Sequence, residues 1–485
     1  MKTRASRVDR LDRDRDWDLD PAEAWAPWTP TPADPWDRKW AGHLYRRAAF
    51  GASWPELQAA LDAGPEATID RLLKGSEGLE EFDRLMDALG PESTQFQPQG
   101  GDEAGLQAWW LQRMIHTAHP LRERMTLFWH NHFATSILKV RQTALMKQQN
   151  LLIRAHVLGK FGPFLLEMSR DPAMLIWLDS NSNARGKPNE NYAREVMELF
   201  ALGVGHSSES DVRNAARAFT GWHTDGRKFV FNRLRHDEGP KSVLGQSGNW
   251  DGGDVVRIVL EQPTAARFLV RKFYRAFISE GAQPPETLLE PLADRFRSSG
   301  YDVADLVGTL LRSRLFFSEH AYRQRVKSPV EYVVGMLRAL EGKPSAQVDN
   351  NFPQGAPPLA GLMEGLGQTL FAPPNVKGWI GGQAWLNSAT LLARHNLAWK
   401  LVQSSQGNLG VAVNTAALVR KHAASRDPEG QVAFLLDLLL QPTTGELDEQ
   451  SRQLTAFAAQ GGTVSDRRLR ETIHAILLMP EYQLS

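Results

Sequence analysis

Residues 121–133 read LRERMTLFWHNHF, and this stretch shows most clearly how the chain folds. Phe128, Trp129 and Phe133 give the segment an apolar side when it is wound as a helix, and polar residues occupy the remaining positions. Helical periodicity of this kind recurs through most of the chain, whereas strand signals are few. The sequence therefore predicts an all-α protein, built as a large multi-helix globular domain.

Eighteen segments carry this periodicity. They cover residues 54–63, 66–74, 106–117, 121–133, 144–158, 163–169, 190–202, 211–220, 254–260, 264–278, 285–297, 303–312, 329–340, 388–403, 415–422, 431–440, 446–459 and 466–478. Several have recognisable starts. Ser328 followed by Pro329 and Glu331 predicts a capped helix with proline in its first turn.

One short β-hairpin is expected to project from the helical body. Residues 228–234 are its best strand, and we expect them to pair with residues 242–244 across a charged tip. The predicted organisation has three parts. Residues 1–42 form an irregular arm rich in Trp, Asp and Pro, residues 43–385 form the main helical domain, and residues 386–485 form a C-terminal helical lobe packed on it. The arm is expected to pack through its indoles.

Composition excludes several classes of protein. Lys plus Arg and Asp plus Glu are both 56, so the formal net charge is zero, which argues against an obligatory nucleic-acid binder. The chain has no cysteine, so disulfides, thiolate metal sites and a cysteine nucleophile are excluded. No apolar run is long enough for a membrane helix, and the first residues lack the apolar core of a signal peptide. The sequence thus predicts a soluble, cytoplasmic protein.

His130 and His132 are the first candidate site residues. On a regular helix they point about 200° apart, so they reach one ion only if the helix loosens near Asn131. A histidine beside aromatic residues can be a metal ligand, a general base or a core residue hydrogen-bonded to a neighbour. For this pair, function and structure are equally favoured.

A second candidate is the helix expected over residues 190–202. Asn191, Glu195 and Glu198 fall on one face, and two carboxylates one turn apart can hold a hard cation or transfer a proton. The alternative is a solvated polar face on which Arg194 pairs with acidic residues four positions away. The preceding loop, Asp179 to Glu190, nearly matches a calcium-binding loop.

That resemblance to a calcium loop breaks at two positions. Ala184 replaces the glycine at position six, and Lys187 takes position nine, so a true EF-hand is improbable. A differently folded Asn-rich cation site stays open, as does a loop whose Asp and Asn side chains satisfy backbone amides.

Two further segments carry candidate binding residues. His236 and Lys241 lie on the predicted hairpin tip, which is either solvated or a lid over a cleft. Trp379 follows a rigid Pro-Pro turn in a Gly-rich stretch that favours structural packing, with a pocket wall as the alternative. None of the standard signatures for hydrolases, zinc proteases, phosphate loops or dinucleotide binding is present.

Several long motifs resemble a bacterial family known as domain of unknown function 1800. They span residues 43–51, 121–136, 188–205, 215–222, 235–245, 327–331, 373–379 and 387–396. The resemblance implies a bacterial source and a helical fold, and it implies no established activity. Proteins similar to the members of this family are often encoded beside proteins of a sulfatase-like family. The resemblance therefore suggests a functional partner of that class.

The leading hypothesis is an enzyme, with metal-assisted hydrolysis as its possible chemistry. His130, His132, Glu195 and Glu198 would bind a divalent cation or act as base and acid, with His236 approaching from the hairpin. Asn191, Arg194, Lys241 and Trp379 would contact the substrate. The alternatives are a binding or scaffold protein for a protein partner or glycan, and a haem protein.

Overall fold

The computed structural model describes residues 20–75, 78–88, 103–281, 283–344, 358–404, 411–460 and 464–485. Within these residues, helices make up nearly all the regular structure, and strands occur only in two-stranded sheets. The predicted all-α class is therefore confirmed.

Helices follow one another along most of the described chain. In the first half they are α1 (Pro21–Trp25), α2 (Arg38–Ala48), α3 (Trp54–Lys74), α4 (Leu79–Ala88), α5 (Glu103–His116), α6 (Pro120–His132), α7 (Ile137–Val140), α8 (Thr143–His156), α9 (Phe161–Arg170), α10 (Pro172–Trp177), the 3-10 turn η3 (Ser180–Ser182), α11 (Asn191–Glu195), the π-helix η4 (Val196–Ala201) and α12 (Glu209–Ala218). In the second half they are η5 (Arg233–Arg235), α13 (Gly252–Leu260), α14 (Pro263–Phe277), α15 (Glu286–Ser298), α16 (Val303–Arg312), α17 (Pro329–Ala339), α18 (Pro358–Glu364), η7 (Gly382–Trp385), α19 (Ser388–Val402), α20 (Thr415–His422), α21 (Pro428–Leu439), α22 (Asp448–Ala458), α23 (Asp466–Leu478) and α24 (Pro480–Gln483).

Local chemistry explains where many of these helices begin. Ser328 and Glu331 form the expected capping box at the start of α17, since each side chain accepts a hydrogen bond from the other residue's backbone N–H. Ser208 and Asp211 do the same for α12. Helix α3 merges two predicted helices across a kink at Gly64, whose φ of 79° favours glycine.

Helix α2 was not among the predicted helices. Its apolar residues Trp40, Ala41, Leu44, Tyr45 and Ala48 recur with a helical period, so the pattern could have predicted it. Nine of its eleven residues, Trp40 to Ala48, are buried. Because α2 begins at Arg38, it also starts inside the stretch predicted as an irregular arm. Trp25, Trp28 and Trp36 of that arm do pack by their indoles, and Trp28 stacks on Phe317 at 4.5 Å. Trp17 lies outside the described residues.

The strand pairing predicted for the hairpin is wrong. Strand β2 (Phe229–Phe231) pairs with β1 (Trp222–Thr224), and β3 (Lys241–Val243) pairs with β4 (Gln246–Gly248). Two small hairpins therefore replace the single one, because each strand finds a partner across a shorter turn. A third sheet joins β5 (Lys343–Pro344) to β6 (Val411–Ala412).

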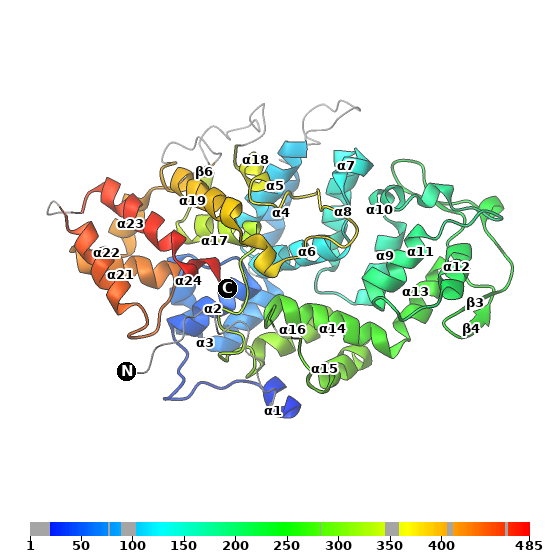
Figure 1. Cartoon of the computed structure of the whole chain (residues 1–485), viewed down its shortest axis with the longest axis horizontal. Helices are drawn as coiled ribbons and strands as arrows, with labels where there is room; N and C mark the ends of the chain where they lie inside the picture. The colour runs from blue at the N-terminus through cyan, green and yellow to red at the C-terminus, as the bar shows by residue number, and fades with distance from the viewer. Residues whose placement is uncertain are drawn as a thin grey trace.

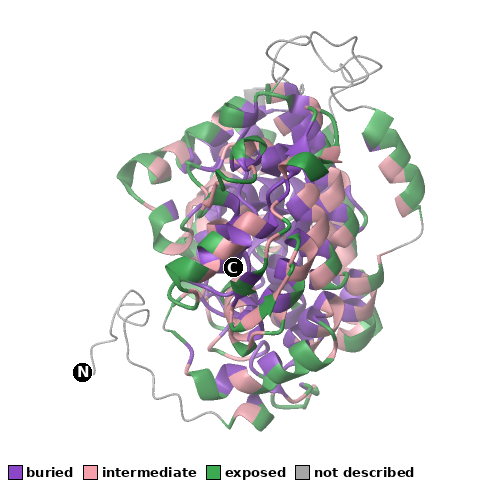
Figure 2. Ribbon diagram, turned by 90° about the vertical axis from the view of Figure 1, so that its right-hand side faces the viewer, coloured by how far each residue is buried: buried purple, intermediate pink, exposed green. Residues whose placement is uncertain are grey.

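The molecule is elongated in the view of Figure 1. Helices α21–α23 form one end, α11–α13 with β3 and β4 form the other, and α2, α6 and α17 lie between them. Figure 2 shows the buried residues concentrated along the middle, under an exposed outer layer. One large apolar cluster spans residues 24–322, and a second joins α5 and α17 to α19–α23. In the described part of the chain, no helix is both long and apolar enough to cross a bilayer.

Candidate functional site

His130 lies in a box of aromatic rings near the end of α6. The rings of Trp110, Phe371 and Trp379 have centroids 5.1, 5.4 and 5.8 Å from the imidazole. Its Nε2 is buried without a hydrogen-bond partner, and burial lowers the pKa of the side chain to about 3. His130 is therefore a neutral, tightly packed residue.

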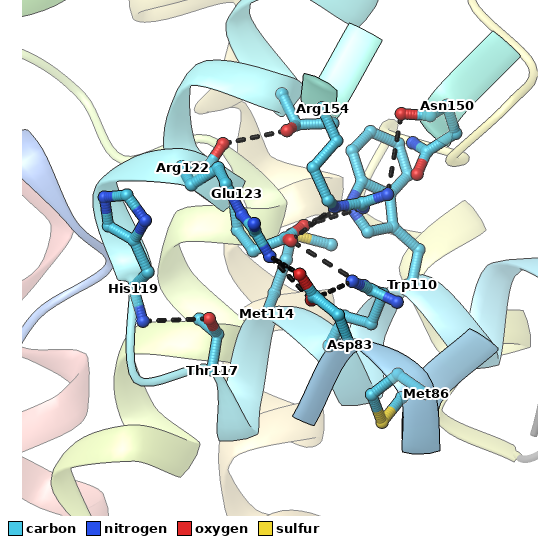
Figure 3. A network of polar contacts seen from close by, with 12 residues as sticks. Asp83, Met86, Trp110, Met114, Thr117, His119, Arg122, Glu123, Asn150 and Arg154 are labelled. Carbon is cyan, nitrogen blue, oxygen red and sulfur yellow. Dashed lines mark hydrogen bonds and ion pairs between the residues drawn. The ribbon is translucent and has the colours of Figure 1, made fainter. Parts of the chain in front are cut away.

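Trp110 also borders a buried ion network (Figure 3). Glu123 is fully buried, and it accepts from Arg154 Nε at 2.6 Å, from Arg154 Nη2 at 2.9 Å and from Trp110 Nε1 at 2.9 Å. Burial alone would raise the pKa of Glu123, but the charges of Arg154 and Arg113 and these hydrogen bonds lower it to about 2. Arg113 in turn reaches Asp83 at 2.5 Å, so the network ties α4, α5, α6 and α8 together.

His132 points away from His130, towards α14 and the π-helix η4. Its Nε2 lies 3.0 Å from the Phe200 carbonyl oxygen, so Nε2–H donates there and Nδ1 is left as an acceptor. Lys272 Nζ lies 3.0 Å from that Nδ1 and 3.2 Å from the Leu199 carbonyl oxygen. Burial, and then the charge of Lys272, lower the pKa of His132 well below its ordinary value.

The amine of Lys272 is correspondingly perturbed. Burial lowers its pKa from 10.5 to about 7. The Leu199 and Phe200 carbonyls are open to these side chains because they lie in the last turn of the helix, where intrahelical partners end. The two polar segments singled out in the sequence thus meet at His132 and Phe200.

The acidic face of α11 and η4 is largely engaged in ion pairs. Arg194 pairs with Glu190 at 3.1 Å, with Glu198 at 3.2 Å and with Glu209 at 2.8 Å. The first two pairs are those expected if this face is a solvated polar surface. Glu195 is half-buried, and its pKa is raised by burial and by Glu198, against the opposing charges of Arg194 and Lys377.

The Asn-rich loop is held by its own hydrogen bonds. The side-chain oxygen of Asn181 accepts from Thr224 N, and that of Asn183 accepts from Asn189 N, each at 2.9 Å. Asp179 binds Lys139 at 2.9 Å and Asn191 at 3.3 Å. Within the residues that the structure describes, no group of three or more His, Cys, Asp and Glu could hold a metal. The four predicted ligands are thus not gathered into such a group, because the two histidines face different clusters.

His236 and Lys241 are bound within the hairpin region. His236 Nδ1 lies 2.8 Å from the Thr220 carbonyl oxygen, and Lys241 Nζ donates to the Asp237 and Gly239 carbonyl oxygens. Trp379 contacts α6 instead, since its backbone N–H donates to Asn131 Oδ1 at 2.7 Å. This contact brings the loop carrying Lys377 beside the end of α6.

Lys272 was missed by sequence reasoning. It occupies an ordinary place in an amphipathic helix, and no local pattern distinguishes it from the other lysines. Its partner His132 is 140 residues earlier in the chain. Only the packing of α14 against α6 and η4 brings the amine to the imidazole.

A family model matches residues 43–484, and its description is a protein of unknown function, domain of unknown function 1800. The chain belongs to this family. The match covers nearly the whole chain and includes every candidate site segment. Neither the curated proteins nor the solved structures contain a match to this chain. The family itself assigns no activity, so a function has to be argued from the site.

Proposed function

We propose that the chain is an enzyme in which Lys272, held in place by His132, transfers protons. The observation that carries the proposal is the 3.0 Å contact between Lys272 Nζ and His132 Nδ1 beside a π-helix. An amine with a pKa near the working pH is well matched to general-base chemistry and to addition to a carbonyl. π-helical turns are frequent at functional sites.

His132 has a positioning role in this proposal. Because its Nε2–H is committed to the Phe200 carbonyl, the Nδ1 lone pair can only accept, so it orients the amine without competing for the same proton. Glu195 lies one helical turn before Leu199, whose carbonyl holds Lys272, and its raised pKa suits a second acid–base group. Lys377 would help to bind a substrate of negative charge.

This proposal keeps only part of the hypotheses drawn from the sequence. Hydrolysis remains one reaction that a Lys base and a Glu acid could perform. A bound cation is not part of the proposal, since the described residues hold no ligand group for it. A sulfatase-like protein, suggested by the family resemblance, remains the proposed functional partner.

Reductive methylation with ¹³C-formaldehyde tests the proposal without knowledge of the substrate. We expect one dimethyl-lysine resonance that titrates near pH 7 and is absent from the Lys272→Met variant. The control is Lys400→Met, which replaces an exposed lysine and should keep this resonance. A panel of carbonyl and ester compounds is then incubated with the unmodified protein. Turnover that rises through pH 7 and disappears in Lys272→Met supports the enzyme. A Lys272 resonance that titrates near pH 10 contradicts it.

A further inference from the structure

A second group of buried basic side chains lies around a cavity between α2, α17 and the end of α21. The cavity measures about 20 Å³, and its polar lining consists of Arg46, Lys327, Gln441 and Tyr482. The rest of its wall is apolar or glycine. Arg46 and Lys327 belong to two sequence motifs, residues 43–51 and 327–331, that the proposed enzyme site does not use.

Arg46 has donors without acceptors in this buried position. The side chain is 6% exposed, its Nη1 donates to Gln441 Oε1, and its guanidinium carbon lies 5.7 Å from the centroid of the Tyr322 ring. Its Nε and Nη2 have no hydrogen-bond partner. Burial lowers the pKa of Arg46 only to about 10, so the guanidinium is charged at neutral pH. An unsatisfied buried charge of this kind is costly unless something pairs with it.

Lys327 lines the other wall of the cavity. It is 5% exposed, and its side-chain nitrogen lies 3.6 Å from the centroid of the Tyr482 ring. Burial, and then the charge of Arg46, lower the pKa of Lys327 well below its ordinary value, although Glu331 opposes this shift. A bound anion would help to keep this amine protonated. The Tyr482 hydroxyl is also buried without a partner.

The nearby carboxylates are already engaged with other arginines. Glu446 pairs with Arg323 at 2.6 Å, Glu331 with Arg124 at 2.5 Å, and Glu280 with Arg325 at 2.8 Å. Arg47 and Arg394 add further positive charge around these pairs. The cavity therefore lies in a buried region with more basic than acidic side chains.

The donor geometry indicates the kind of anion that is missing. Three other arginines of this chain each bind a carboxylate through both Nε and Nη2, the two atoms that have no partner in Arg46. They are Arg217, Arg267 and Arg295. That edge matches two oxygens in one plane. A cavity that holds one water needs about 10–15 Å³, so a cavity of about 20 Å³ admits only the smallest ligands.

We propose that this cavity is a binding site for a small planar oxyanion of three or four heavy atoms, such as formate or bicarbonate. Arg46 would supply the two-donor edge, Lys327 the opposing charge and Tyr482 a hydroxyl donor. Water fills the same volume but carries no charge to pair with Arg46 or to hold a proton on Lys327. The site shares no residue with Lys272 and His132, so the two proposals stand or fall separately.

Calorimetry with sodium formate and sodium bicarbonate, against sodium chloride at equal ionic strength, tests the site in the full chain. Binding of either oxyanion at one site per chain, with chloride much weaker, is expected for the wild type. Lys327→Met keeps an aliphatic side chain on Tyr482 and should weaken binding at least tenfold. Lys400→Met is the matched control and should bind like the wild type.

Arg46→Lys provides a second variant that keeps the charge and removes the two-donor edge. It should lose the preference for formate over chloride. Absence of oxyanion binding by the wild type overturns the proposal. So does unchanged affinity in both Lys327→Met and Arg46→Lys, or equal binding of chloride and formate. If Lys327→Met fails to fold, Arg46→Lys and the wild-type anion selectivity still decide the question.

Discussion

At the scale of single residues, His130 shows how packing decides the chemistry of a side chain. A histidine beside carboxylates and aromatic residues could have been a base or a ligand. Three aromatic rings instead surround it, and they offer an imidazolium no compensating charge. Its pKa of about 3 makes it a residue of the core at neutral pH.

Replacing His130 with Phe should therefore remove a pH-dependent loss of stability. In the wild type the unfolded chain takes up a proton near pH 6.5, whereas the folded chain does so only near pH 3, so the free energy of unfolding falls as the pH drops between these values. By pH 4 this one residue should account for about 3 kcal/mol. Urea unfolding at pH 7 and pH 4 measures it.

The control for this substitution is His206→Phe, at an exposed position. It should show the same fall in stability between pH 7 and pH 4 as the wild type. If His130→Phe shows that same fall, then His130 takes up its proton as readily in the folded chain as in the unfolded one, and the prediction is wrong.

At the scale of elements, Glu123 joins four helices through a carboxylate that is completely buried. Glu123→Gln keeps the shape but removes the charge, so Arg154 and Arg113 lose their buried partner. Breaking a buried pair from one side commonly costs about 3–5 kcal/mol. We expect a loss of that size in the free energy of unfolding, measured by urea denaturation at pH 7. Glu81→Gln, at an exposed site on α4, should change it by less than about 0.5 kcal/mol.

Helix α17 approaches the end of α2 so closely that only glycine fits between them. A Cβ on Gly335 would lie 2.2 Å from the Phe50 carbonyl oxygen, and that backbone atom cannot rotate away. Gly335→Ala should therefore lower stability by about 1–3 kcal/mol, despite the better helix propensity of alanine.

Gly361 offers the matched control, because a Cβ there meets nothing within 4 Å. Gly361→Ala on α18 should raise stability by about 0.5–1 kcal/mol. Thermal melting of both variants measures the contrast. Equal effects of the two substitutions would show that the contact between Gly335 and Phe50 does not limit the packing of α17.

At the scale of the whole molecule, the predicted C-terminal lobe, residues 386–485, shares its apolar core with earlier helices. The second cluster contains Trp110 and Tyr332 as well as Leu435 and Ile473. The chain near α24 also pairs with residues before α17, since Lys327 N donates to the Gln483 carbonyl oxygen at 2.8 Å. The three-part division of the chain stays a prediction.

The shared core implies that residues 386–485 should not fold alone. Expressed as a fragment, they would expose the apolar face that α5 and α17 cover in the full chain. We expect no cooperative thermal transition by circular dichroism, while the full chain shows one. A cooperative transition in the isolated fragment would establish the lobe as an independent domain.

Much of the secondary structure could be predicted because its causes are local. The capping box of Ser328 and Glu331 depends on residues three apart, and amphipathic helices such as α14 depend on a period of about 3.6 residues. Helix α2 follows the same period and could have been predicted in the same way. The hairpins escaped prediction because the choice of strand partner depends on turn geometry that the residue pattern did not distinguish.

The candidate site could also be predicted only in part from the sequence. The sequence by itself determined that Trp129–His132 and the Glu195–Glu198 helix carry polar groups on defined faces, and that the fold is helical. Only the tertiary structure decided that His130 lies among aromatic rings, that His132 meets Lys272, and that Arg46 and Lys327 share one cavity. The physical reason is that a helical face depends on residues within a few positions. A pKa, a buried charge or a hydrogen-bond partner depends instead on which distant helices pack together.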